Sequence, residues 1–194
     1  MITFDVDIDV ADRDKLLSLI PHRVATQTSK EGLRKHNSGI YVTEVPYDSL
    51  NGRASITYDQ AEARGYFKID ILNVGVYQLI RDQEHYDRIL AQEPDWTRLN
   101  DRKFVEQIIH INNWYTTMQQ MPEPVNSIGR MAMFLSIIRP GKKHLIGKPW
   151  REVALTVWDK TEDGYSFKKS HSCSYAHLVA LHMNLLADSA DQSN

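Results

Sequence analysis

The sequence has a single cysteine, Cys173, among its 194 residues. An intramolecular disulfide is therefore excluded, and the first residues, Met-Ile-Thr-Phe-Asp, have neither the basic region nor the apolar segment of a secretory signal. No window approaches the run of about eighteen apolar residues that a membrane span needs. We therefore expect a cytoplasmic protein without a membrane partner.

Neither sign of charge dominates, since the formal net charge is −2. A basic field over the whole protein is thus excluded, and any contact with nucleic acid has to come from local charge. The local charge is uneven: acidic residues gather at 5–14 and 82–101, whereas basic residues gather at 139–151. With 42% hydrophobic and 25% charged residues, the composition is typical of a globular domain.

Aspartate is abundant at the start of the chain, with five in the first fourteen residues. Asp5, Asp7 and Asp9 alternate with other residues, so an extended strand would bring all three to one face. Like charges at such spacing raise one another's pKa, and a divalent cation between the carboxylates removes that cost. The alternation predicts either a cation site or simply a polar strand edge.

A calcium-binding EF-hand loop does not fit this pattern. Its sixth position requires Gly and its twelfth requires Glu. Counted from Asp5, these positions hold Val10 and Leu16.

Hydrophobic periodicity predicts a chain whose first part is rich in strands and whose second part is helical. We expect strands at the aspartate-rich start and over 38–43, 53–58 and 66–72, and helices over 13–20, 76–92, 104–118, 128–138 and 174–187. The predicted fold class is α+β, with a small mixed or antiparallel sheet and a helical carboxyl-terminal half. We expect a catalytic core over 1–92, a helical part over 93–188 and a flexible tail over 189–194.

The strand over 66–72 carries a second acidic position. Lys68 and Asp70 lie two residues apart and therefore share a strand face. If this strand joined the sheet of the first one, Asp70 would complete a three-carboxylate site with two of Asp5, Asp7 and Asp9. Such a set suits two Mg²⁺ ions about 3.5–4 Å apart, as in phosphoryl transfer. Lys68 would then neutralise a triphosphate, or serve only as a counter-charge.

Two stretches resemble the signatures of one enzyme family. Gly65-Tyr66-Phe67-Lys68-Ile69-Asp70-Ile71-Leu72 is similar to the motif "glycine, two residues, lysine, aromatic, aspartate, aromatic or aliphatic, leucine" of bacterial C-family DNA polymerases, the DNA polymerase III alpha subunits. The strand Asp5-Val6-Asp7-Ile8-Asp9-Val10, followed by Arg13-Asp14, resembles that family's alternating aspartate strand, which leads into an Arg-Asp helix.

Three further segments resemble the same family in collinear order. His36-Asn37-Ser38-Gly39-Ile40-Tyr41-Val42 resembles its His-Ala-Gly-Val-Val segment, and Ile138-Arg139-Pro140-Gly141 resembles its Tyr-Arg-Pro-Gly turn. The stretch from Gly164 to Ala176 is similar to its "GYGFNKSHAAAYA" sequence.

The resemblance implies a palm with the fold of the beta-type nucleotidyltransferases. Three aspartates of that palm bind two Mg²⁺ ions, which join a deoxynucleoside triphosphate to the primer 3′-hydroxyl. Carried over to this chain, they are Asp5, Asp7 and Asp70, with Lys68 as the nucleotide-binding residue. Because the family has a longer spacing before its Arg-Asp pair, Asp7 and Asp9 remain an alternative strand pair, so the implied metal ligands are Asp5, Asp7, Asp9 and Asp70.

Basic residues in two later segments are candidates for DNA contacts. They are Arg139, Lys142 and Lys143 in a Pro- and Gly-containing stretch, and Lys168, Lys169 and His171 next to the last predicted helix. The start of a helix favours phosphate, and exposed lysines hold a DNA backbone by charge. The alternative is a solvated basic loop and an ordinary helix cap.

Several parts of the family's polymerases have no counterpart here. The chain has no Gly-Ser pair for gripping a triphosphate, and the region between Arg-Pro-Gly and Lys-Ser-His is very short. We therefore expect a shortened, split or phage-encoded polymerase subunit that acts on DNA primer-template and deoxynucleoside triphosphate with a second polypeptide. The alternatives are a non-catalytic DNA-binding or replisome-assembly subunit, and another two-metal enzyme, either a nuclease or a template-independent nucleotidyltransferase.

Overall fold

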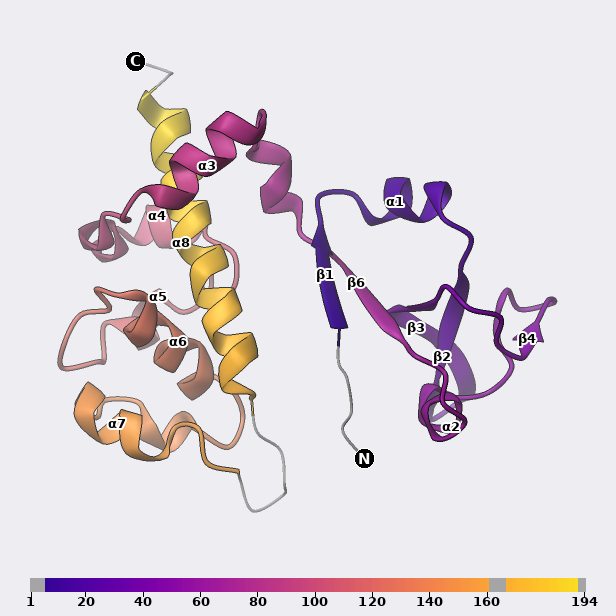
Figure 1. The fold of residues 1–194 in the computed structure, drawn as a ribbon. Helices are drawn as coiled ribbons and strands as arrows, with labels where there is room; N and C mark the ends of the chain where they lie inside the picture. The colour runs from indigo at the N-terminus through magenta and orange to yellow at the C-terminus, as the bar shows by residue number, and fades with distance from the viewer. Residues whose placement is uncertain (1–5, 161–166, 192–194) are drawn as a thin grey trace. The chain divides into compact units, whose positions relative to one another are not determined.

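The structure is a computed structural model that describes residues 6–160 and 167–191. The chain divides into two compact units, residues 1–79 and residues 80–194 (Figure 1). The first unit contains a small mixed sheet and the second is helical, so the predicted α+β class is confirmed. Among the described residues, no helix has the length and apolar character needed to cross a membrane.

Four strands form the sheet of the first unit, in the order β1-β6-β3-β2. β1 (Val6–Val10) pairs in parallel with β6 (Ile69–Asn73), which pairs antiparallel with β3 (Gly32–Tyr41). β3 in turn pairs antiparallel with β2 (Arg23–Ser29). The two strands predicted to carry aspartates are therefore neighbours in one sheet.

One face of this sheet is covered by α1 (Arg13–Leu19). Asp12 caps the helix, because its side chain accepts a hydrogen bond of 3.0 Å from the Lys15 amide. Leu17 of α1 packs with Ile40 and Ile71 of the sheet in a small buried cluster.

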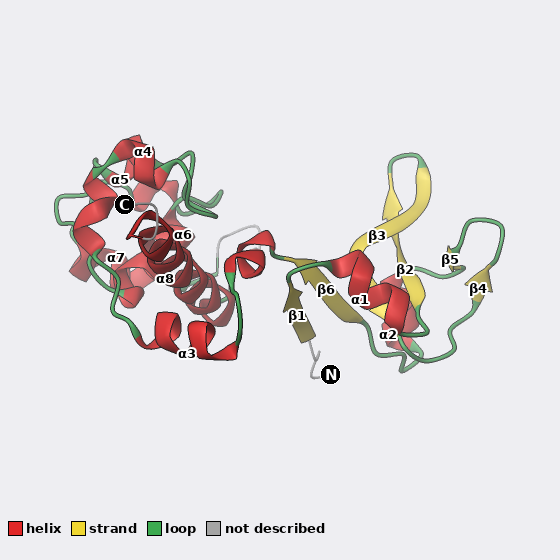
Figure 2. Ribbon diagram, turned by 90° about the horizontal axis from the view of Figure 1, so that it is seen from above, coloured by secondary structure: helices red, strands yellow, loops and turns green. Residues whose placement is uncertain are grey.

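The opposite face is covered in part by α2 (Tyr58–Ala63) and by a two-stranded ribbon of β4 (Tyr47–Asp48) and β5 (Arg53–Ala54) (Figure 2). The sequence led us to expect a strand over 53–58. That expectation is wrong beyond Ala54, because Thr57 and Gln60 form a capping box that begins α2.

The second unit is built around α8 (Lys169–Asp191), and α6 (Ile128–Ile137) packs against it (Figure 1). Buried side chains from both helices and from the segment 104–111 share one core, which includes Phe104, Ile108, Ile111, Met131, Phe134, Leu135, Val179 and Met183. The remaining helices are α3 (Gln83–Ala91), α4 (Arg102–Val105), α5 (Tyr115–Met118) and α7 (Trp150–Thr156). Short 3-10 turns span Gly75–Leu79, Trp96–Asn100 and Lys143–Leu145.

The division of the chain differs from the expected boundary at residue 92. The helix α3 belongs to the second unit, because Asn184 of α8 donates hydrogen bonds to the carbonyls of Ile89 (3.1 Å) and Gln92 (2.7 Å). Asp188 of α8 also lies 2.7 Å from the guanidinium of Arg88. Residues 189–191, which we expected in the flexible tail, belong to α8.

Candidate active site on the sheet of the first unit

The parallel pair β1 and β6 brings two of the predicted site residues together. Asp7 pairs directly with Asp70, and Asp9 pairs with Leu72. Because paired residues of adjacent strands point to the same side, Asp7, Asp9 and Asp70 share one face of the sheet, opposite α1. Asp5 lies outside the described residues.

Asp70 is buried and is held by two hydrogen-bond donors. The ammonium of Lys68 forms an ion pair with Oδ2, and the hydroxyl of Ser38 donates to Oδ1 over 2.7 Å. Burial by itself would raise the pKa of Asp70, but the hydrogen bonds from Lys68 and Ser38 bring it below its usual value. Asp70 is therefore an anion at neutral pH, and each of its two oxygens accepts a hydrogen bond from one of these donors.

Ser38 reaches Asp70 because β3 contains a bulge. Val24 of β2 pairs with Ile40, but Thr26 pairs with Lys35, so the four residues 36–39 stand opposite Ala25 alone. The imidazole Nδ1 of His36 closes this bulge by accepting hydrogen bonds from the Gly39 amide (2.9 Å) and the Ser38 amide (3.3 Å).

The imidazole of His36 is neutral, and its Nδ1 accepts hydrogen bonds. Burial lowers its pKa, and the charge of Asp70, whose Oδ1 lies 3.6 Å from Nδ1, opposes that shift. A neutral ring with Nδ1 unprotonated is also the tautomer that the two amide hydrogen bonds require. His36 thus positions Ser38 rather than acting as a second cation beside Asp70.

The side chain of Lys68 is guided to Asp70 by close packing. A Cβ atom on Gly39 would stand 2.8 Å from Lys68 Cδ, so any other residue at this position would displace the lysine side chain. The ammonium of Lys68 lies 5.9 Å from the ring centroid of Tyr58, at the start of α2. The ring of Tyr58 also makes an edge contact with His36 at 5.5 Å between centroids.

Arg13 ties the end of β1 to the middle of the sheet. Its guanidinium donates through Nε to the carbonyl of Ile71 (3.1 Å), and its amide donates to the side chain of Asn73 (3.0 Å). Asn73 is the last residue of β6, the strand of Asp70, so Arg13 fixes where α1 begins relative to both acidic strands. The resemblance singled out Arg13, and the structure shows what the side chain contacts.

Asp7 and Asp9 are exposed, and their charges affect each other. The pKa of Asp9 is raised by partial burial and by the charge of Asp7, while a hydrogen bond from Tyr77 lowers it. Within residues 6–160 and 167–191, no three side chains of Asp, Glu, His or Cys lie close enough together to hold a metal ion. Asp7 and Asp70, which pair directly across β1 and β6, are the two carboxylates that a Mg²⁺ ion would use here, since magnesium sites commonly combine one or two carboxylates with substrate phosphates and water.

The residues predicted to contact DNA lie in the second unit. Arg139, Lys143 and Lys168 occur in turns and connections, and Lys169 and His171 are in the first turn of α8, which begins before the predicted residue 174. Lys142 differs from the rest, because it is buried and its ammonium donates to the carbonyl of Thr156 over 2.7 Å. It holds the end of α7. Residues 164–166 of the matching motif lie outside the described residues.

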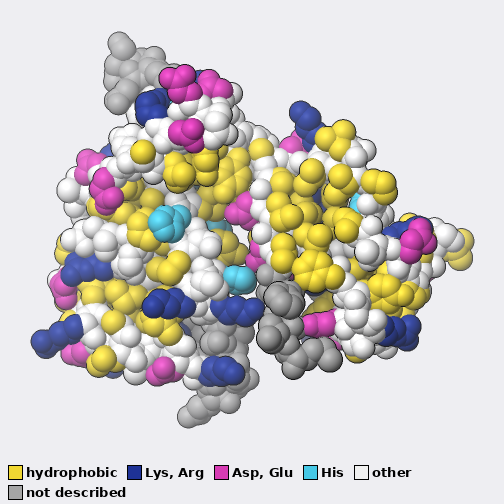
Figure 3. Space-filling view, in the orientation of Figure 1, with side chains coloured by type: hydrophobic (Ala, Val, Ile, Leu, Met, Phe, Trp, Pro, Cys, Tyr) yellow, Lys and Arg dark blue, Asp and Glu magenta, His cyan; other side chains and the backbone are white. Residues whose placement is uncertain are grey.

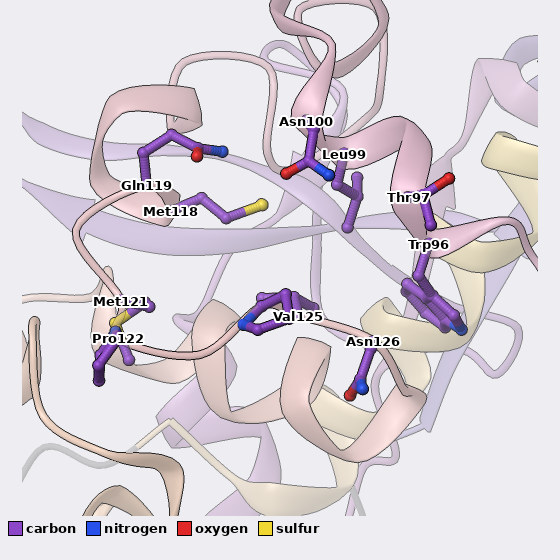
Figure 4. Close-up of a pocket in the computed structure, with 11 residues that line it drawn as sticks. Trp96, Thr97, Leu99, Asn100, Met118, Gln119, Met121, Pro122, Val125 and Asn126 are labelled. Atoms are coloured by element: carbon purple, nitrogen blue, oxygen red, sulfur yellow. The ribbon is translucent and has the colours of Figure 1, made fainter.

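A hollow of about 450 Å³ in the second unit has a different character (Figure 4). Leu99 and Met118 point into it, and Asn100, Gln119 and Asn126 supply uncharged amides at its border. Since no charged side chain lines this hollow, it lacks the means to neutralise a triphosphate.

Of the two donors to Asp70, Lys68 was assigned a role from the sequence, but Ser38 was not, and neither was the bulge that presents it. The only local signal was the pair of small residues Ser38-Gly39 after His36, and this pattern does not show which strand lies opposite.

Comparisons of the chain with protein-family models, with curated proteins and with solved structures found no match. The acidic face of the sheet is therefore what indicates a function.

Proposed function

We propose that this chain is a Mg²⁺-dependent nucleotidyltransferase of DNA replication, a reduced C-family polymerase subunit that works with a second polypeptide. The observation that carries the proposal is the direct pairing of Asp7 with Asp70 in parallel strands, with Lys68 on Asp70. Two carboxylates on one face, with a lysine paired to one of them, match the needs of a metal-bound triphosphate.

Each residue has a defined task in this proposal. Asp7 and Asp70 supply carboxylate oxygens to Mg²⁺, which lowers the pKa of an attacking hydroxyl and neutralises phosphate charge. Lys68 is beside the same oxygens and stabilises charge on the triphosphate. Ser38 and the bulge closed by His36 keep Asp70 in one orientation.

Asp9 and Asp5 are the candidates for a second ion. The pKa of Asp9 is raised first by burial and second by the charge of Asp7, which repels a charge on Asp9. A cation bound between them would remove this repulsion and return the pKa of Asp9 toward its usual value.

The test is extension of a labelled DNA primer on its template with deoxynucleoside triphosphates and Mg²⁺. The full chain is assayed alone and together with candidate partner polypeptides. We expect Asp70→Asn and Asp7→Asn to abolish extension, whereas Asp59→Asn, an exposed acid on α2 of the same unit, retains it.

Mn²⁺ binding gives a second measurement that needs no partner. Nuclear magnetic resonance signals around β1 and β6 should broaden at low Mn²⁺ concentration in the natural chain and in Asp59→Asn, but not in Asp7→Asn. Extension that survives Asp70→Asn would contradict the catalytic assignment.

A second candidate is a non-catalytic DNA-binding subunit with the same fold. One observation favours it: both oxygens of Asp70 already have donors, as in an ion pair that only stabilises the sheet. In that case Mn²⁺ leaves the spectrum unchanged, and the chain binds DNA without extending it.

A further inference from the structure

Several rings and a guanidinium lie in contact with one another near the start of α8. The imidazole of His110 lies 4.5 Å from the ring of Tyr175, and Tyr175 stacks on Phe167 at 5.8 Å between centroids. The guanidinium of Arg139 lies over Phe167 at 4.8 Å, and the ring of His171 lies 6.4 Å from that of Tyr175. These five residues are called the ring cluster below.

The ring cluster contains strain and unsatisfied polar atoms. His110 has a φ of 67°, and it is the one non-glycine residue in the described part of the chain with a positive φ. Its Nε2 and the Nε of Arg139 are both buried, and neither has a hydrogen-bond partner in the structure of the described residues. Buried donors without partners are rare in folded proteins, and such atoms, like backbone strain, concentrate at functional sites.

Core packing explains only part of this arrangement. Phe167 and Tyr175 do pack against the core of the second unit. Two more cations nevertheless lie over rings of the same region, Lys143 at 5.9 Å from Trp114 and Lys169 at 5.8 Å from Trp158. Three cation–ring pairs therefore have their cations between residues 139 and 169.

The same region is basic. Residues 139–171 contain eight Lys or Arg against four Asp or Glu. Figure 3 shows Lys and Arg side chains gathered over the part of the second unit where α7 lies and α8 begins. A ligand of this surface is therefore an anion with flat rings.

We propose that the ring cluster, with Lys143 and Lys169, binds single-stranded nucleic acid: bases stack on the exposed parts of the rings and phosphates contact the cations. Stacking on side-chain rings requires bases that are unpaired, which excludes a duplex as the preferred ligand. The cations come from two chain segments and sit over three separate rings, which favours a strand over a mononucleotide. This inference extends the DNA contact of the proposed function, and it requires no catalysis.

The test is fluorescence anisotropy of the full chain with labelled oligo(dT) of about twelve nucleotides, in a buffer with a metal chelator. Affinity should fall between about 50 and about 200 mM salt, with a logarithmic slope near −0.7 for each neutralised phosphate. Lys169→Gln should make this slope shallower by about 0.7, whereas Lys103→Gln, an exposed lysine of α4, should leave it unchanged.

Ring variants test the stacking. Phe167→Leu and Tyr175→Leu keep an apolar side chain on the core, and each should weaken binding by between about fivefold and about a hundredfold. Tyr115→Leu is the matched control, because Tyr115 is half-buried on the same core and its hydroxyl donates a hydrogen bond to the carbonyl of Asn100. Far-ultraviolet circular dichroism checks that all three variants are folded.

Two results would overturn the proposal. One is that the ring variants bind oligo(dT) as tightly as Tyr115→Leu does. The other is that a blunt duplex or deoxythymidine monophosphate competes as well as the strand. If Asp70→Asn leaves primer extension unchanged while Tyr175→Leu still loses binding, the catalytic proposal fails and this one stands.

Discussion

A methyl group at position 39 would stand 2.8 Å from Lys68 Cδ, 3.0 Å from His36 Nδ1 and 3.1 Å from Ala25 Cβ. Lys68 is the most easily moved of these neighbours, because its side chain is long and partly exposed. A side chain at position 39 would therefore disturb the ion pair of Lys68 with Asp70, which belongs to the proposed site.

Gly39→Ala should destabilise the first unit and separate Lys68 from Asp70. Overpacking of this kind costs about 1–3 kcal/mol in the free energy of unfolding, measured by urea denaturation. The pKa of Asp70 should rise toward its usual value, which carboxyl carbon chemical shifts report. Gly75→Ala is the control, because a Cβ there has no neighbour within 4 Å. Equal stability of the two variants would contradict the close packing.

Asp70→Asn should show how the ion pair depends on pH. The pKa of Asp70 is lowered in the folded state, so its stabilisation is complete well above the unfolded value of 3.8 and is lost as the pH falls through the folded value. In metal-free buffer at pH 7 we expect the variant to be less stable by about 1–3 kcal/mol. The difference should shrink below about pH 4. A difference that grows in acid would contradict the lowered pKa.

Polar contacts fix the helix α3 to α8. The buried side chain of Asn184 caps the end of α3, and Asp188 lies within 3.3 Å of Arg81 and of His85. The pKa of Asp188 is lowered by the hydrogen bond from Arg88 and by these neighbouring charges. A helix whose own sequence is mostly polar thus obtains its position from another helix.

Asn184→Leu should loosen α3 selectively. The carbonyls of Ile89 and Gln92 would lose their donor, at a cost of about 1–3 kcal/mol. Hydrogen exchange should accelerate in α3 while α6 keeps its protection. Ser174→Ala, an exposed position of α8, should leave both helices unchanged. Equal acceleration in α3 and α6 would argue against a local cap.

Prediction from the sequence succeeded where one local pattern decides an element. The apolar spacing of 128–138 predicted α6 to within one residue, and the alternating aspartates predicted β1. The segment 104–118 was predicted as one helix, but α4 ends at Val105 and α5 begins at Tyr115, with His110 in a left-handed conformation between them. Apolar spacing does not reveal such a break, because the side chains are buried in either case.

The candidate site was predictable only in part for a related reason. Lys68 and Asp70 share a strand, so their proximity follows from the alternation of side chains. Ser38 meets Asp70 because a bulge of β3 shifts its register, and register depends on tertiary pairing. The residues of the capping box, Thr57 and Gln60, have the sequence spacing typical of a helix start, and this spacing would have predicted α2.

Each of the two units has its own hydrophobic core. All four tryptophans, at positions 96, 114, 150 and 158, belong to the second unit. Tryptophan fluorescence therefore reports on residues 80–194 alone, whereas the circular dichroism signal comes from both units.

Gly39→Ala should shift only one of two unfolding transitions. Since Gly39 lies in the first unit, the transition followed by tryptophan fluorescence should stay at the same urea concentration, while part of the circular dichroism change moves lower. Asn184→Leu should have the opposite effect. If either variant moved both signals together, the units would have to unfold as one cooperative body.

The contacts between α3 and α8 also set an order of events during synthesis. The hydrogen bond from Arg88 to Asp188 joins residues 100 positions apart, whereas the strands of the first unit are all present once residue 73 has been made. Since a ribosome adds about 5–20 residues per second, roughly 5–20 seconds separate the synthesis of Arg88 from that of Asp188. During that interval the nascent chain carries a complete sheet followed by helical segments whose apolar side chains have no α8 to cover them, so the second unit is the part exposed to aggregation during synthesis.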